Sequence, residues 1–110
     1  PARRAVFATG AAPAAVYRAC GLQTDARGFV AVDAALQSVS HGAVFASGDV
    51  AAVSAHPRPK SGVYAVRPGP PHTPTLRCFL PGKAPVEFVP QRQALALLST
   101  GRKHAIANRA

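Results

Sequence analysis

Large apolar side chains and acidic side chains are both scarce in this sequence. It has no tryptophan and no methionine, and only five phenylalanines and two tyrosines stand among its 110 residues. Apolar residues make up 48% of the chain, but many of them are alanine, which contributes little volume to a core. A chain of this length buries only about two-thirds of its unfolded surface. These absences predict one domain or less, with a thin core.

Long hydrophobic runs and paired cysteines are also lacking. No apolar run reaches the roughly eighteen residues that a membrane-spanning helix requires, and no signal-peptide pattern opens the chain. Cys20 and Cys78 lie far apart and outside any Cys-x-x-Cys motif, which excludes a local redox dithiol or a zinc knuckle. We expect two buried thiols, no metal site, no catalytic side chain, no transmembrane segment and a cytoplasmic protein.

Thirteen basic residues face only four acidic ones, so the formal net charge is +9. Such a charge favours anionic partners through long-range attraction. The basic residues are scattered, however, and only Arg3-Arg4 and Arg102-Lys103 are adjacent pairs. This is not the pattern of a nucleic-acid-binding tract. We expect no nucleic-acid partner, and a small basic nucleic-acid-binding module is kept as an alternative.

Short apolar runs bounded by glycine predict buried strands in the first half of the chain. The expected strands cover residues 5–8, 28–33 and 44–47. Between the first two, residues 14–20 have the pattern of a short helix, and Gly21 is a suitable stop signal. Strands and helices that alternate in this way predict an α/β fold.

Eleven prolines shape the second half of the chain. Residues 60–80 predict a helical turn, a proline-rich bend and a second helix that ends at Pro81-Gly82. After it we expect a strand over 86–89 and a small antiparallel meander formed by residues 95–98 and 104–107, with a turn at Thr100-Gly101. The composition shifts near Pro81, which predicts a domain boundary between residues 80 and 81.

The predicted strand over residues 44–47 leads directly into Gly48-Asp49. In α/β sheets small ligands bind outside the carboxyl ends of the strands. Gly48 permits a close approach to the backbone, and Asp49 offers acceptors for a sugar hydroxyl. Residues 50–52 then suit the start of a helix whose positive end faces a phosphate. By themselves, however, such residues are more often a plain turn with a helix cap.

The order of the motifs resembles the closing part of flavoproteins with two dinucleotide-binding domains. The motifs are Ala8-Thr9-Gly10 and residues 25–32, 36–38, 44–49 and 58–70. Together they are similar to the pyridine nucleotide-disulfide oxidoreductase superfamily in its type II NADH dehydrogenase branch, and most similar to the flavoprotein domain fused ahead of selenide, water dikinase. The resemblance implies that residues 1–80 are the C-terminal portion of a Rossmann-like FAD/NAD(P)-binding domain. Residues 81–110 would begin a small β interface domain.

The resemblance also implies FAD-binding roles for six residues, namely Thr9, Gly10, Gly48, Asp49, Lys60 and Gly62. Thr9 and Gly10 would lie near the flavin, where the chain returns from the NAD(P)H domain to the FAD domain. Gly48 and Asp49 would hold the ribityl chain. Lys60 and Gly62 would lie at the start of the helix beneath the isoalloxazine ring.

The family resemblance implies a parent flavoprotein oxidoreductase that passes electrons from NAD(P)H through FAD to a small-molecule or quinone-like acceptor. This sequence contains no Gly-x-Gly-x-x-Gly fingerprint for the FAD pyrophosphate. We therefore expect it to be inactive without the remainder of the parent chain, in the cytoplasm or at the inner face of the membrane. Self-association through exposed edge strands, giving a homo-oligomer, is compatible with this interpretation.

Overall fold

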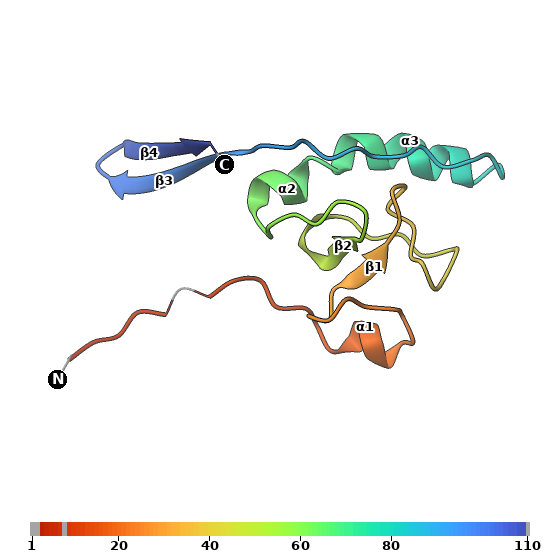
Figure 1. Cartoon of the computed structure of the whole chain (residues 1–110), viewed down its shortest axis with the longest axis horizontal. Coiled ribbons are helices and arrows are strands. Elements are labelled where there is room, and N and C mark those ends of the chain that lie inside the picture. Colours follow the sequence, from red (N-terminus) through yellow and green to blue (C-terminus); the bar gives the residue numbers. More distant parts are fainter. Residues whose placement is uncertain (1–2, 8, 110) are drawn as a thin grey trace.

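The computed structural model describes residues 3–7 and 9–109, and it mixes helices with strands as the sequence predicts (Figure 1). In chain order the elements are α1 (Val16–Ala19), β1 (Val30–Val32), the 3-10 turn η1 (Gly48–Val50), β2 (Ala51–Val53), α2 (Gly62–Val66), α3 (Gly69–Phe79), β3 (Leu95–Gly101) and β4 (His104–Arg109).

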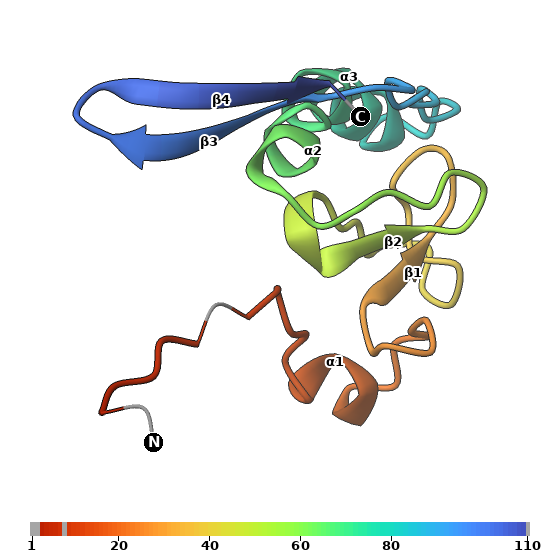
Figure 2. The ribbon, with the colours of Figure 1, turned by 60° about the vertical axis from the view of Figure 1, so that its left-hand side comes forward.

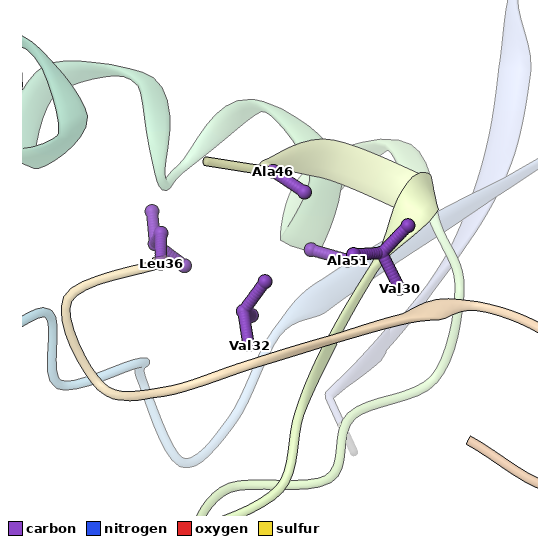
Figure 3. Close-up of a cluster of buried hydrophobic side chains, with 5 residues drawn as sticks. All are labelled: Val30, Val32, Leu36, Ala46 and Ala51. Atoms are coloured by element: carbon purple, nitrogen blue, oxygen red, sulfur yellow. The ribbon is translucent and has the colours of Figure 1, made fainter. Parts of the chain in front are cut away.

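The core surrounds a short parallel strand pair, β1 and β2. Val30 pairs with Ala51 and Val32 with Val53. All three residues of β1 are buried, as expected for a parallel strand that is covered on both faces. Leu36 and Ala46 complete the buried cluster around this pair (Figure 3). The predicted strand over 28–33 is thus confirmed in shorter form.

Two aspartates fix the turns at either end of β1. Asp25 Oδ1 accepts hydrogen bonds from the backbone N–H groups of Arg27 (3.0 Å) and Phe29 (2.9 Å). Asp33 Oδ1 accepts hydrogen bonds from the N–H groups of Ala35 (2.8 Å) and Gln37 (3.0 Å). Such side-chain acceptors replace the missing backbone partners of a turn. Two of the four acidic residues therefore stabilise the turns on either side of β1.

The strand predicted over residues 44–47 is wrong. Phe45 forms only an isolated bridge with Gln37, and the strand β2 follows Gly48-Asp49 instead of preceding it. Phe45 packs toward α3, with its ring centroid 5.0 Å from that of Phe79 in an edge-on arrangement. Gly48 then turns the chain at φ +74°. This tertiary packing overrides the local strand pattern, and β2 occupies the residues that were expected to begin a helix.

Two further strand predictions fail. Residues 5–7 are exposed and extended without a strand partner, and Ala8 lies outside the described residues. Residues 86–89 form no strand, because tertiary bonds replace a strand ladder there: Phe88 N–H donates to Ala34 O (2.7 Å), and Thr75 Oγ1 donates to Val86 O (2.8 Å). The prediction of two buried cysteines also fails, because Cys20 is exposed and Cys78 is only partly buried.

The helices follow the sequence prediction closely. α1 ends before Gly21, whose φ of +79° terminates it. α2 and α3 are separated only at Arg67-Pro68. The bend is shorter than expected because Pro70 and Pro71 fall in the first turn of α3, where a missing N–H leaves no bond unmade. In the described part of the chain no helix is long and apolar enough to cross a bilayer.

The last two strands form an antiparallel hairpin that extends away from the rest of the molecule (Figures 1 and 2). The predicted strand pair is confirmed, but the tip lies at Arg102-Lys103, with φ of 48° and 63°, because Gly101 belongs to a β-bulge. No residue of either strand is buried. The predicted domain boundary at residue 80 stays a prediction.

Candidate ligand site

A cavity of about 320 Å³ opens beside β2. The 3-10 turn, the segment 54–60, α2 and the extended residues 88–91 form its walls. Its charged and aromatic lining residues are Asp25, Arg27, Asp49, His56, Arg58, Lys60, Tyr64, Arg67 and Phe88. The cavity therefore combines cations, two carboxylates and two aromatic rings in one small volume.

Gly48 and Asp49 form one rim of this cavity. Gly48 has φ +74°, a left-handed conformation that favours glycine, and a Cβ there would lie 3.6 Å from Ala65 O. Asp49 is exposed, and within the described residues its carboxylate accepts no hydrogen bond and forms no ion pair. A carboxylate with free lone pairs at a cavity rim can accept hydrogen bonds from a hydroxyl-bearing ligand.

Lys60 lies beside Ala51, the first residue of β2. Its Nζ donates a hydrogen bond to Ala51 O and lies 4.2 Å from the centroid of the Phe29 ring. Burial lowers the pKa of Lys60 against the attraction of Asp25 and Asp49, and the like charge of Arg27 lowers it further. The ammonium is thus partly stripped of water without a contacting counter-ion.

The structure gathers three of the six predicted FAD-binding residues at this cavity, namely Gly48, Asp49 and Lys60. Gly62 begins α2, is exposed and does not line the cavity. Thr9 and Gly10 lie in an exposed extended segment, and neither lines the cavity. Their roles toward a flavin stay predictions.

Several lining residues received no role from the sequence. Arg58 is held in place by hydrogen bonds from Nε to Gln91 O (3.2 Å) and from Nη1 to Pro57 O (2.9 Å). Its position two residues before Lys60 is a signal that sequence reasoning could have used. Phe88 reaches the cavity from beyond the predicted domain boundary through its bond to Ala34. No local sequence pattern predicts this contact between Phe88 and Ala34.

Histidine, cysteine, aspartate and glutamate side chains are the usual protein ligands of metal ions. Across residues 3–7 and 9–109, no three His, Cys, Asp or Glu side chains gather in a group that could hold a metal ion. His56 lines the cavity, while His41 lies at the surface and bonds to Ser40. The cations, carboxylates and aromatic rings that line the cavity suit an organic ligand with hydroxyl and anionic groups.

Comparison with known families gives one match. Residues 1–69 match the pyridine nucleotide-disulphide oxidoreductase family, whose members are oxidoreductases that typically bind FAD and use NAD(P)H on a Rossmann-like fold. No curated protein and no solved structure matches the chain. The matched region is more than half of the 110 residues and includes Gly48, Asp49 and Lys60. The chain therefore belongs to the pyridine nucleotide-disulphide oxidoreductase family.

Proposed function

We propose that this chain supplies the ribityl-binding part of the FAD site in a flavoprotein that passes electrons from NAD(P)H through FAD to an acceptor. The observation that carries the proposal is the Asp49 carboxylate. It follows the left-handed Gly48 at the rim of a cavity and is engaged by no other described residue. A polyol chain presents the hydroxyl donors that such a carboxylate requires.

The residues around Asp49 fit a flavin in charge and shape. Gly48 turns the backbone at the cavity rim with φ +74°, and the half-buried Tyr64 and Phe88 provide apolar wall. When bound, FAD supplies the electron-transfer chemistry, and the protein contributes position and electrostatics. On this proposal Asp49 holds the sugar-alcohol chain, while Lys60 supplies positive charge nearby.

The finer assignment also belongs to this proposal. The motif order supports a type II NADH dehydrogenase-like parent, similar to the flavoprotein domain fused to selenide, water dikinase, with a small-molecule or quinone-like acceptor. Such an enzyme would work in the cytoplasm or at the inner membrane face. Thr9, Gly10 and Gly62 would reach the flavin only when the rest of the parent chain is in place.

The extended shape of the chain supports a partner in the form of additional parent chain. Its radius of gyration is 16.9 Å, whereas a compact chain of this length would have about 13 Å. Val6 is 95% exposed and Phe7 is 88% exposed, which is unusual for large apolar side chains. We propose that the remainder of the flavoprotein covers them and provides the pyrophosphate cradle.

Replacing Asp49 by Ala in the full-length protein tests the proposal. Loss of a charge-assisted hydrogen bond to the ribityl chain costs about 1.5–3 kcal/mol, so the Kd for FAD should rise about tenfold to a hundredfold. Glu87→Ala is the matched control, because Glu87 is exposed and does not line the cavity. Flavin fluorescence titration gives both constants. Unchanged FAD affinity in Asp49→Ala, or no flavin binding by the intact protein, would overturn the proposal.

A further inference from the structure

We infer that Arg27 and Lys60 form a subsite for a phosphate-type dianion in the cavity beside β2. The inference goes beyond the ribityl contact of Asp49 and rests on different side chains. It assigns a ligand class, the phosphate group, to cations that otherwise have no counter-ion in contact.

The Phe29 ring lies close to both cations. It is 1% exposed and therefore fixed. Arg27 Cζ lies 5.1 Å from the ring centroid, and Lys60 Nζ lies 4.2 Å from it. Both distances are within the range of cation–π attraction. Both residues also line the cavity, so two positive groups border the same volume.

No carboxylate neutralises these cations at contact distance. Asp25 is the nearest acid in sequence, but its Oδ1 is occupied by the N–H groups of Arg27 and Phe29. In the part of the chain that the structure describes, neither Arg27 nor Lys60 has a carboxylate oxygen within 4.0 Å. Burial lowers the pKa of Lys60 even though Asp25 and Asp49 attract its ammonium from a distance, and the charge of Arg27 lowers it further. An anion that contacts both groups would relieve this unfavourable arrangement.

The charge of the lining indicates a dianion. Four basic side chains line the cavity against two carboxylates, an excess of two positive charges with His56 neutral; the basic residues are Arg27, Arg58, Lys60 and Arg67. A phosphate monoester carries about −1.5 to −2 charges near neutral pH. The planar guanidinium of Arg27 presents paired donors that match phosphate oxygens, and the ammonium of Lys60 adds a compact charge.

Two sources can supply such a phosphate group. It can belong to a flavin nucleotide bound at Asp49, or to a separate phosphorylated small molecule. The chemistry of recognition is the same in both cases. Riboflavin and FMN distinguish the sources, because they share the ribityl chain and differ only in the phosphate.

The first experiment titrates inorganic pyrophosphate into the full-length protein by calorimetry at fixed ionic strength. Replacing Lys60 by Met or Arg27 by Met should weaken binding about tenfold or more, as expected when a charge-assisted contact is removed. Lys83→Met is the matched control, because Lys83 is exposed and outside the cavity; it should change the Kd less than about twofold. Lys60→Arg should retain most of the affinity, and circular dichroism confirms that each variant folds. Equal affinity of Lys60→Met and wild type, or no binding by the wild type, would overturn the subsite.

Lysine labelled with ¹³C at Cε provides a second measurement. Saturation with pyrophosphate should raise the pKa of Lys60 in the NMR titration, because an adjacent dianion favours the ammonium form. The neighbouring charged groups, Asp25, Asp49 and Arg27, are the same with and without the ligand. An unchanged Lys60 titration at saturation would show that pyrophosphate binds elsewhere and would overturn the subsite.

The flavin arms keep this inference separate from the proposed function. If Lys60→Met weakens FMN but leaves riboflavin unchanged, the phosphate belongs to the flavin nucleotide. If pyrophosphate binding depends on Lys60 and pyrophosphate does not compete with FMN, a separate phosphorylated ligand is the source. If no flavin binds while pyrophosphate still requires Lys60, the FAD proposal fails and the subsite stands. If FAD binding requires Asp49 but pyrophosphate binds without Lys60, the subsite alone fails.

Discussion

Large aliphatic side chains are buried around β1 and β2, the packed part of the chain, and exposed in the β3–β4 hairpin. Around β1, Val32 is fully buried and Leu36 is 1% exposed. In the hairpin, Leu97 is 66% exposed and Ile106 is 60% exposed. Both regions have strongly apolar sequences, so hydrophobicity alone does not decide which one is buried.

Backbone connectivity accounts for the difference. β1 pairs with β2 on one side, and its Ala31 bonds to Gln23 O and Val39 N on the other. Among the described residues the strands β3 and β4 pair only with each other, and an isolated two-stranded hairpin is marginally stable at best. Stability should therefore reside in the part around β1, to which the cavity is attached. The hairpin should contribute little until a partner covers it.

Leucine truncation in the two regions gives the largest expected contrast. Leu36→Ala removes a fully buried side chain from the core and should cost about 2–5 kcal/mol of unfolding free energy. Leu97→Ala should cost less than about 0.5 kcal/mol, because its side chain is already mostly in water. Urea unfolding followed by circular dichroism measures both. Comparable losses would show that the hairpin is part of the same packed unit.

Threonine provides a second matched pair. Thr75 is 1% exposed, and its hydroxyl lies within hydrogen-bonding distance of Pro71 O (3.1 Å) and Val86 O (2.8 Å). Thr75→Val would leave the Val86 carbonyl without this donor and should cost about 1–2 kcal/mol in the same unfolding assay. Thr100→Val, in the exposed hairpin, should be neutral. Equal effects of the two substitutions would mean that the contact between α3 and residue 86 does not stabilise the packed part.

The elements that sequence patterns predict well are those with local causes. The helix stop at Gly21 depends on residues within one turn of the chain. The hairpin is predicted too, because its strands adjoin in sequence. The strand over 44–47 was mispredicted because Phe45 contacts Phe79, a partner more than thirty residues away that no local period reveals.

The candidate site is only partly visible in the sequence, for the same reason. Gly48-Asp49 and Lys60 stand out as motif residues, and the structure gathers them at one cavity. Phe88 also lines that cavity, where its backbone N–H donates to Ala34 O. That contact depends on tertiary packing. Thr9 and Gly10 were predicted for the site by family resemblance, and neither lines the cavity.

Two glycines with left-handed backbone conformations provide a third matched pair of substitutions, one in each region. Gly48 and Gly101 have φ of +74° and +88°, so an alanine at either position is strained by about 1 kcal/mol. At Gly48 a Cβ would make an ordinary contact with Ala65 O, so Gly48→Ala should lower the unfolding free energy by about 1 kcal/mol through backbone strain alone. Gly101→Ala should loosen only the hairpin and leave the main transition unchanged. A shift of that transition by Gly101→Ala would contradict the separation of the two regions.

The smallest expected effect is the pH dependence that Lys60 contributes. Burial lowers its folded-state pKa below the ordinary value of 10.5. Between these two pKa values the unfolded chain binds more protons than the folded chain, so the unfolding free energy increases as pH rises through that window. Lys60→Met should remove this increase, whereas Lys103→Met, at the exposed tip of the hairpin, should leave it in place.

The comparison between variants matters because other titratable groups also contribute to the pH dependence of stability. Their contribution is common to the wild type and to both lysine variants, so it cancels when the pH profiles are subtracted. A Lys60 profile that falls with pH would mean that contact with Asp25 and Asp49 outweighs burial. Asp25 and Asp49 would then already serve as counter-ions for the Lys60 ammonium. The packed part would differ from the hairpin in the burial of its apolar side chains, but not in the pairing of its charged groups.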